Sequence, residues 1–421
     1  MYTSHPSMAT PDYSFFQRIP LASGHLVKRF IRTMNTLARQ PGMLISAASQ
    51  DAAEAKAIYR LLKNSQLTEE VVLQTYRQET LRQMKATGES VFLCVQDTTE
   101  IDYGARAKTT GLGEFRSSKS KGLLAHSALV LTPSGLPLGV LHQKIWARDP
   151  ALKGERQVSR PYEEKESYKW TESAKASMHD LPASTRLIQI GDREADFFEF
   201  LHTLEEDGQS YVVRSVQNRI TETDGERMWD HVRAQEESAR IVVSLPRDTH
   251  REKPARETTL AIRYVSDTAQ VPGHLKRKKA GYMPLTCSLI HVVEVTPLPD
   301  QEPIEWFLVT NLPLADGAAA CEKVGWYVRR WQIERFHYIL KSRCGVEKLQ
   351  QRDANALRKL ILMYSIIAVD LQRLTYLARL DPDAPCTQAM SEEEWHVLYR
   401  IVHQTKQLPA QPLPCARWSG P

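Results

Sequence analysis

Hydrophobic side chains in the first part of the chain recur at helical spacing. Between residues 21 and 88, positions such as Leu26, Phe30, Met34 and Leu37 are apolar, and lysines and arginines surround them. This period of three to four residues is typical of amphipathic helices that bury one face. The pattern predicts a small, basic, helical domain, whose simplest interpretation is a helical cap on something larger.

After residue 90 the pattern changes to short apolar runs bounded by turns, which predict strands. The first run ends at Asp97, and a second, at 186–191, stops just before Asp192 and leads into a helix. Further strands are expected at 123–133, 137–148 and 210–217. Strands interleaved with helices predict a mixed α/β sheet with helices packed against it.

A segment without helical spacing follows, from residue 220 to residue 312. Its candidate strands lie at 240–246, 258–266, 286–295 and 305–311. Because loops rich in proline, lysine and arginine separate them, we interpret the segment as a β-rich insertion within the α/β domain. Helical spacing returns at 326–345 and 355–380, and the proline-rich tail from 405 is expected to be disordered.

Composition is that of a soluble globular protein. Of the 421 residues, 42% are hydrophobic and 25% are charged, and no apolar run approaches the roughly 18 residues of a membrane span. The N-terminus has no charged start followed by an apolar core, so we expect no signal peptide and a cytoplasmic protein. The six cysteines form no C-x-x-C pair, which argues against a disulfide framework or a zinc site. A net charge of +5 permits a polyanionic partner without requiring one.

Three carboxylates occupy positions that commonly carry chemistry. Asp97 and Asp192 follow apolar strand runs, where open α/β sheets place their sites, and Glu334 lies mid-helix. Three converging carboxylates would repel one another unless metal ions neutralised them, and oxygen-only ligands favour Mg²⁺ or Mn²⁺. Two such ions about 3.5–4 Å apart would support in-line attack on a phosphodiester.

Each of these carboxylates also has a purely structural interpretation. Asp97 could cap the turn that follows it, and Asp192 could be the N-cap of the next helix. Glu334 lies four residues after Arg330, and such pairs are usually ion pairs on the exposed surface of a helix. For either aspartate alone, capping is the more common role.

The segment 326–345, "WYVRRWQIERFHYILKSRCG", favours the chemical interpretation. At about 100° per residue, Tyr327, Arg330, Glu334 and Lys341 fall in one stripe of a single helix, and apolar residues lie elsewhere on the wheel. Such a helix would be buried on its sides and face a polar partner. A carboxylate for metal, with arginine, lysine and tyrosine for phosphates or a base, is a coherent set of roles.

These motifs carry a resemblance to a known family. The spacing Y-x2-R-x3-E-x6-K resembles that of bacterial insertion-sequence DDE transposases of the insertion-sequence-four family, the relatives of the transposon-five transposase. "QDTTEIDY" at 96–103 and "DREADF" at 192–197 are similar to the two aspartate motifs of this family. "EKESYKW" at 164–170, "YVVRS" at 211–215 and "WFLVTN" at 306–311 follow in family order, so the resemblance covers roughly residues 25–375.

The resemblance implies a ribonuclease-H-like catalytic domain and cut-and-paste DNA transposition. Asp97, Asp192 and Glu334 would bind two Mg²⁺ ions, for which Mn²⁺ could substitute. A nick at the transposon end would free a 3′ hydroxyl that forms a hairpin, which is reopened before transfer to target DNA. The residues that would contact DNA are Tyr327, Arg330, Lys341, Arg214, Lys165 and Trp306. Trp306 matches the tryptophan that stacks on a flipped base, and a buried strand aromatic is the alternative.

The same resemblance assigns roles to the segments. They are 1–20 as a poorly ordered start, 21–88 as a helical DNA-binding domain, 89–219 and 313–380 as the catalytic domain, 220–312 as the β insertion, and 381–421 as a truncated or atypical tail.

The chain departs from the family pattern at Tyr338, where the best-known member has a second lysine, and at both ends of the sequence. We expect a homodimer on double-stranded DNA, in the bacterial cytoplasm and at the nucleoid when bound. Because the dimerisation segment of longer members is shortened or replaced, the alternative is a decayed, non-catalytic DNA-binding or inhibitory derivative. A metal-dependent nuclease without strand transfer is a third possibility.

Overall fold

The computed structural model divides the chain into two compact units. Unit 1 comprises residues 1–89, 98–155 and 334–421, and unit 2 comprises residues 90–97 and 156–333. The described residues are 13–104, 109–116, 120–149, 160–222, 225–245, 255–277, 281–299, 302–380 and isolated positions between 385 and 414. Most of the proline-rich tail, and much of the basic loops at 116–121, 250–256 and 276–279, lies outside the described residues.

Unit 1 begins with helices, as the hydrophobic spacing predicts. They are η1 (Tyr13–Arg18), α1 (Gly24–Arg39), α2 (Ile45–Ala48), α3 (Ala52–Leu62) and α4 (Glu69–Ala86). The side chains of Ser23, Asp51 and Thr68 accept a hydrogen bond from the first turn of α1, α3 and α4 respectively, which fixes where each helix begins. Within the start that was predicted to be poorly ordered, η1 buries Phe16 against Phe30, with ring centroids 4.8 Å apart.

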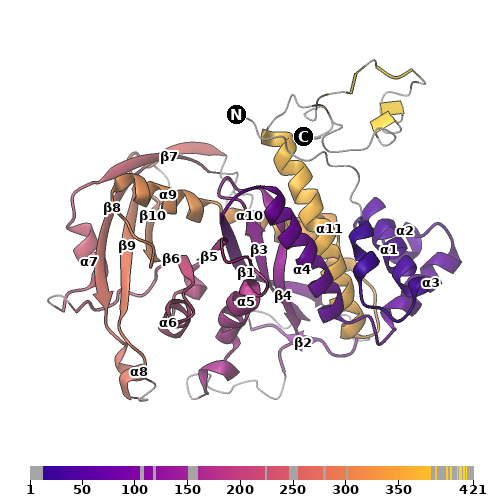
Figure 1. Ribbon diagram of the computed structural model, residues 1–421, viewed down its shortest axis with the longest axis horizontal. Helices are drawn as coiled ribbons and strands as arrows, with labels where there is room; N and C mark the ends of the chain where they lie inside the picture. The colour runs from indigo at the N-terminus through magenta and orange to yellow at the C-terminus, as the bar shows by residue number, and fades with distance from the viewer. Residues whose placement is uncertain are drawn as a thin grey trace. The chain divides into compact units, whose positions relative to one another are not determined.

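The strands of unit 1 are the second part of β1 (Val91–Gly104), β2 (Gly113–Glu114), β3 (Lys121–Leu131) and β4 (Pro137–Trp146). Strands β3 and β4 form an antiparallel hairpin, and α4 and α11 (Ala354–Leu380) pack on β4 (Figure 1). Helix α11 is long and apolar enough to cross a membrane by length and composition, but 67% of its most apolar window is buried inside the protein. We therefore interpret α11 as the core helix of unit 1.

The prediction that the first strand ends at Asp97 is wrong. Strand β1 continues to Gly104, because after its pairing with β5 it becomes the neighbour of β3. Buried Thr99 and Ile101 alternate with more exposed residues in this second part, as a half-buried strand requires.

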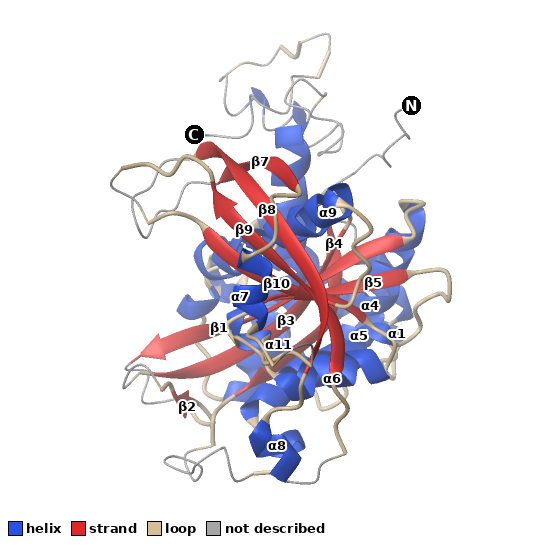
Figure 2. Cartoon of the chain, turned by 90° about the vertical axis from the view of Figure 1, so that its left-hand side faces the viewer, coloured by secondary structure: helices blue, strands red, loops and turns tan. Residues whose placement is uncertain are grey.

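Unit 2 contains the rest of the sheet, as Figure 2 shows for its long strands. Its strands after β1 are β5 (Arg186–Gly191), β6 (Ser210–Arg214), β7 (Ala239–Leu245), β8 (Arg256–Ala269), β9 (Leu285–Glu294) and β10 (Glu305–Thr310). Strands β1, β5 and β6 are parallel, and β10, β9, β8 and β7 follow in antiparallel order. The β-rich insertion thus extends the main sheet beyond β6, and the predicted mixed α/β fold is confirmed.

The helices of unit 2 cover this sheet. They are α5 (Lys169–Met178), α6 (Phe198–Glu206), α7 (Met228–Arg233), α8 (Gly273–Arg277) and α9 (Gly317–Val328), with short 3₁₀ turns η4 (Tyr162–Glu164), η5 (Glu166–Tyr168) and η6 (Arg193–Ala195). Trp170, Phe200 and Tyr211 are fully buried in a core that joins α5 and α6 to the strands.

The single helix predicted at 326–345 is also wrong. The chain forms α9, then α10 (Trp331–Tyr338) and a π-helix η7 (Ile339–Arg343), followed by η8 (Val346–Lys348). Between α9 and α10, the amides of Arg329 and Arg330 donate to carbonyls only three residues back, at 3.1 and 2.9 Å. These tighter bonds interrupt the α-helical repeat, so a uniform wheel does not apply across 329–330.

Candidate functional site

Two predicted site residues lie at equivalent positions beyond the pairing of two adjacent parallel strands in unit 2. Val95 of β1 pairs with Ile190 of β5. Asp97 lies two residues further along β1, and Asp192 lies two residues after Ile190, just past the end of β5 at Gly191. Since paired strands lie about 4.7–4.9 Å apart, this register brings the two aspartates side by side. Both are half-buried. The register therefore places the two residues at neighbouring positions where the β1–β5 pairing ends.

The capping interpretation of Asp192 is also confirmed. Its Oδ1 accepts a hydrogen bond of 2.9 Å from the Glu194 amide and caps η6. An ionised carboxylate has two oxygens and about four lone-pair directions, so one cap bond leaves capacity for other donors or for a cation. Capping and ligation are compatible at this residue.

Glu334 lies on α10, is exposed, and is the first residue of the last segment of unit 1. Among the described residues there is no preformed group of three His, Cys, Asp or Glu side chains arranged for a metal ion. The triad of Asp97, Asp192 and Glu334 therefore stays a prediction. The strand register supports only the proximity of its two aspartates.

A buried tyrosine lies near Asp192. Tyr327 lies in the last turn of α9, is 5% exposed, and meets Trp306 edge-on with ring centroids 5.6 Å apart. Burial raises the pKa of the Tyr327 hydroxyl and the charge of Asp192 adds to the shift, whereas Arg330 and Arg214 oppose it. Tyr327 thus lies between two guanidinium groups and one of the two aspartates.

Arginines concentrate around Tyr327. The Arg214 guanidinium lies 5.9 Å from the Trp306 ring centroid and hydrogen-bonds to Tyr327. Burial lowers the pKa of Arg214, and repulsion from Arg193 and Arg330 lowers it further. Cations that repel one another in a half-buried site are suited to an anion that bridges them, such as a phosphate. Sequence reasoning missed Arg193, although it directly follows Asp192.

Two of the predicted DNA contacts have partners within the protein. Lys165 Nζ lies 3.3 Å from Glu199 Oε1 in unit 2, and Lys341 Nζ lies 3.5 Å from Glu347 Oε1 in unit 1. The Lys341–Glu347 pair is about one-third exposed on both sides, and pairs of this kind are worth little, so exchange for a phosphate would cost little.

Asp196 is a second residue that sequence reasoning missed. It is 2% exposed, and its carboxylate accepts bonds from the amides of Val216 and Gln217 at 2.5 and 2.7 Å and from the Arg219 guanidinium. It therefore ties the turn after Asp192 to the loop that follows Arg214. The second aspartate of "DREADF" was the feature of the sequence that could have indicated this role.

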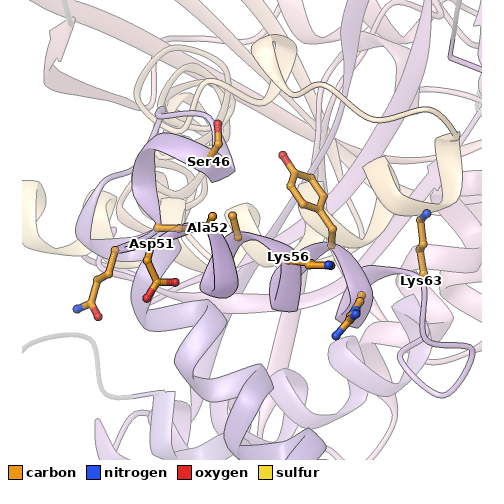
Figure 3. Close-up of a pocket in the computed structure, with 10 residues that line it drawn as sticks. Ser46, Asp51, Ala52, Lys56 and Lys63 are labelled. Atoms are coloured by element: carbon orange, nitrogen blue, oxygen red, sulfur yellow. The ribbon is translucent and has the colours of Figure 1, made fainter.

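The N-terminal helices of unit 1 form a groove of about 630 Å³ beside α2 and α3. Figure 3 shows Ser46, Lys56 and Lys63 on this groove, and Tyr59 and Arg60 also line it. The opposite face of α3 is buried, at Ile58, Leu61 and Leu62. Helix α3 thus presents Lys56, Tyr59 and Arg60 to the groove, and α2 adds the Ser46 hydroxyl. Cations of this kind are complementary to a nucleic-acid backbone.

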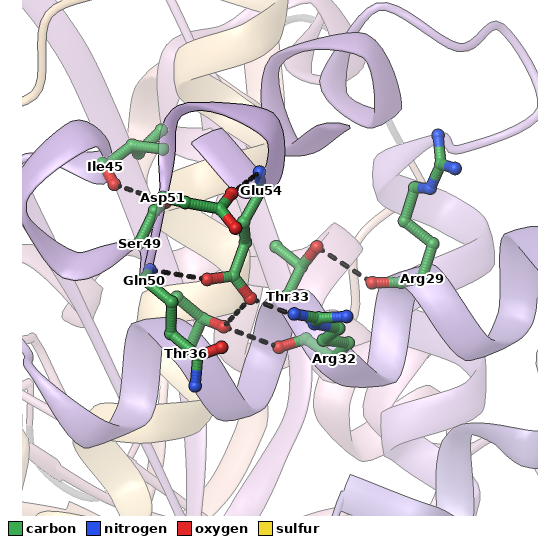
Figure 4. A network of polar contacts seen from close by, with 9 residues as sticks. All are labelled: Arg29, Arg32, Thr33, Thr36, Ile45, Ser49, Gln50, Asp51 and Glu54. Atoms are coloured by element: carbon green, nitrogen blue, oxygen red, sulfur yellow. Dashed lines mark hydrogen bonds and ion pairs between the residues drawn. The ribbon is translucent and has the colours of Figure 1, made fainter. Parts of the chain in front are cut away.

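A polar network fixes α3 against α1 (Figure 4). Glu54 accepts hydrogen bonds from Arg32 Nε at 3.0 Å, Thr36 Oγ1 at 3.0 Å and the Gln50 amide at 2.7 Å. The Gln50 amide is the main cause that lowers the pKa of Glu54, and Thr36 and Arg32 add to it. Asp51 Oδ1 in turn accepts from the Glu54 amide at 2.7 Å.

Two family models match this chain. Residues 17–67, which include α1 to α3, match the transposase DNA-binding model, and residues 171–369 match the transposase DDE domain model. The chain carries a transposase DDE domain. The DDE match includes Asp192 and Glu334, whereas Asp97 lies before its first residue.

These matches support a DNA-binding transposase, with DNA as its partner and a metal-dependent nuclease or transferase activity. DDE transposase domains use divalent metal ions. The aspartate pair of the β1–β5 register fits such an ion, although only Asp192 lies within the matched residues. The paired donors, Asp97 and Asp192, are both carboxylates, and hard divalent cations prefer oxygen ligands.

Proposed function

We propose that the protein cuts DNA at transposon ends and transfers the freed 3′ ends into target DNA by a cut-and-paste route. Asp97, Asp192 and Glu334 would be the metal-binding triad. The observation that carries the proposal is the β1–β5 register, which places Asp97 and Asp192 at neighbouring positions in a chain with a transposase DDE domain. Tyr327 and Arg214 interact with each other near Asp192.

In this proposal Asp97, Asp192 and Glu334 would hold Mg²⁺, two ions by analogy, and the metal would supply activation of the attacking oxygen and stabilisation of the leaving oxygen. The chain itself holds and orients the DNA. Arg214, Arg330 and Tyr327 grip the phosphate at the cut, and Lys165 and Lys341 exchange their carboxylate partners for neighbouring phosphates. Trp306 provides a half-buried ring on which a flipped base of the hairpin can stack.

Each step exchanges one phosphorus–oxygen bond for another. Water first breaks the bond to the 3′ oxygen at the transposon end. The new 3′ hydroxyl then attacks the opposite strand to form a hairpin, water reopens it, and the same hydroxyl attacks target DNA. No oxidant or reductant is required, and the nucleophile loses one proton at each step.

We further propose that the active species is a homodimer on DNA in the bacterial cytoplasm. The only support for a dimer is the resemblance to the insertion-sequence-four family, whose active complexes are dimers that cut DNA in trans. Sedimentation of the protein with and without an end duplex measures this, and cleavage by a complex that contains only one chain would contradict it.

The test of the function uses purified protein, MgCl₂ and a labelled duplex that carries the terminal inverted repeats flanking the gene. Nicked, hairpin and joined products are expected. Glu334→Ala should abolish cleavage and keep binding, whereas Glu236→Ala, an exposed glutamate outside the triad, should cut normally. Binding without cleavage by the unaltered protein would instead support a decayed, inhibitory derivative, and cleavage without joining would support a nuclease.

A further inference from the structure

Two glycines hold the backbone of the α1–α2 loop against the backbone that follows the π-helix η7. Gly42 has φ +85, and a Cβ added there would lie 2.5 Å from the Arg343 carbonyl oxygen. Gly345 has φ +61, and a Cβ added there would lie 3.1 Å from Gly42 Cα. Both conformations favour glycine, so this direct crossing of two main chains requires glycine at both positions.

A second contact attaches the same helical region to the core of unit 1. Lys359 of α11 donates to the carbonyl oxygens of Leu62 and Asn64, at 2.9 and 3.1 Å. These carbonyls lie at the C-terminal end of α3, where helix carbonyls have no partner within the helix and a lysine is favourable. Helix α3 is thus held by α11 at its end, and by Glu54 near its start.

The segment on the other side of the crossing carries one predicted catalytic residue and one predicted DNA contact. Glu334 lies on α10, and η7 follows α10 directly and contains Lys341. The Cys344 amide closes this turn on the Ile339 carbonyl at 2.9 Å, five residues back, and π-turns of this type occur frequently at functional sites. One unbroken stretch of chain therefore connects Glu334 to the crossing at Gly345.

We propose that the Gly42–Gly345 crossing and Lys359 make the α2–α3 groove and the Glu334–Lys341 segment one rigid body, so that DNA held in the groove determines which phosphate is cut. The proposal rests on the proposed function and deepens it. Gly42, Gly345 and Lys359 are positioning residues. The two glycines act through the backbone that carries Glu334 and Lys341, and Lys359 acts by holding the end of α3.

The experiment compares Gly42→Ala with a matched control, Gly88→Ala. Gly88 also has positive φ, at +72, but an added Cβ there meets nothing within 4 Å. The control therefore reproduces the backbone strain without the collision. Lys359→Met is a second test variant, which removes the tether to α3 without adding bulk.

Three quantities are measured on the full chain: affinity for the end duplex, nick position at nucleotide resolution, and amide exchange of residues 339–345 with and without the duplex. To relieve the collision, the backbones must separate by roughly 1 Å, and a misplacement of that size can lower a rate by about 100-fold. We expect Gly42→Ala and Lys359→Met to bind within about threefold of the unaltered protein, since the groove is unchanged. Both should cut more slowly and at several phosphates, whereas Gly88→Ala should cut at one.

Amide exchange can be measured whether or not the DNA is cut, so it tests this inference independently of the proposed function. DNA should slow exchange at 339–345 in the unaltered protein and in Gly88→Ala, but less in the other two variants, whether or not cleavage occurs. If DNA leaves these amides unchanged, or does not bind, the inference is wrong. If folded Gly42→Ala cuts at the same single position as the unaltered protein, the inference is wrong, even where transposition itself is demonstrated. Should Gly42→Ala fail to fold, the same result in Lys359→Met would overturn the inference.

Discussion

At the scale of single residues, Trp306 combines two environments. One edge meets buried Tyr327 and its ring lies near Arg214, yet the side chain is only half-buried. An aromatic ring that is both held in place and accessible can receive a base, and such stacking is worth about 1–3 kcal/mol per base. The buried-aromatic alternative would instead predict a loss of stability.

We therefore expect Trp306→Ala to slow hairpin formation by roughly 10-fold to 100-fold, because flipping then lacks its stacking partner. First-strand nicking, which needs no flipped base, should change little. Trp306→Phe is the matched control and should retain most of the rate. Time courses of nicked and hairpin products measure both steps, and equal slowing of the two in Trp306→Ala would contradict the assignment.

Asp196 carries the second residue-scale prediction. Asp196→Asn removes the charge that pairs with Arg219, whose side chain is 6% exposed, and so leaves a buried cation without compensation. We expect a loss of about 3–5 kcal/mol in the free energy of unfolding. Urea unfolding measures this, and Asp196→Asn with Arg219→Met should recover part of the loss. A loss below about 1 kcal/mol would show that the pair is not a structural tie.

At the scale of elements, Glu54 connects α3 to α1, and its contribution to the free energy of unfolding depends on pH. Its folded pKa is lowered, first by the Gln50 amide. A carboxyl with a lowered folded pKa stabilises the fold above its unfolded pKa of about 4.3, and the stabilisation disappears as pH falls through the folded value.

Replacing Glu54 by Gln should therefore cost about 1–2 kcal/mol near pH 7, where charged hydrogen bonds are lost, and progressively less below about pH 4. Chemical unfolding of both proteins across this pH range gives the difference. Glu70→Gln, an exposed glutamate in the first turn of α4, is the control and should show little difference at any pH. A cost independent of pH would mean that shape, and not charge, matters at Glu54.

The elements also show what the sequence could and could not predict. The apolar runs before Asp97 and Asp192 located both aspartates, because a buried parallel strand needs an unbroken hydrophobic run. The continuation of β1 was missed because it depends on pairing with β3, which is distant in sequence. The break at Arg329 and Arg330 was missed because "YVRRWQ" contains neither glycine nor proline, and hydrogen bonds to the third residue back leave no compositional signal.

At the scale of the whole molecule, each unit has its own basic surface. Unit 1 carries the α2–α3 groove with Lys56, Arg60 and Lys63, and unit 2 carries Arg193, Arg214 and Arg330 around Tyr327. The net charge of +5 did not predict this, because acidic side chains elsewhere balance most of the cations. The distribution of charge, more than its sum, is what suits a polyanionic partner.

The cations of the α2–α3 groove lead to a prediction about the salt dependence of DNA binding. Each lysine that neutralises a phosphate releases counterions, so it contributes about 0.9 to the slope of log affinity against log salt. Lys56→Ala should weaken binding to end duplexes and lower this slope by roughly that amount. Lys85→Ala, at the exposed end of α4 and outside the groove, should leave the slope unchanged. Fluorescence anisotropy over a series of salt concentrations measures both variants. If Lys56→Ala lowers affinity equally at every salt concentration, Lys56 does not contact a phosphate, and the groove would bind DNA through other side chains or not at all.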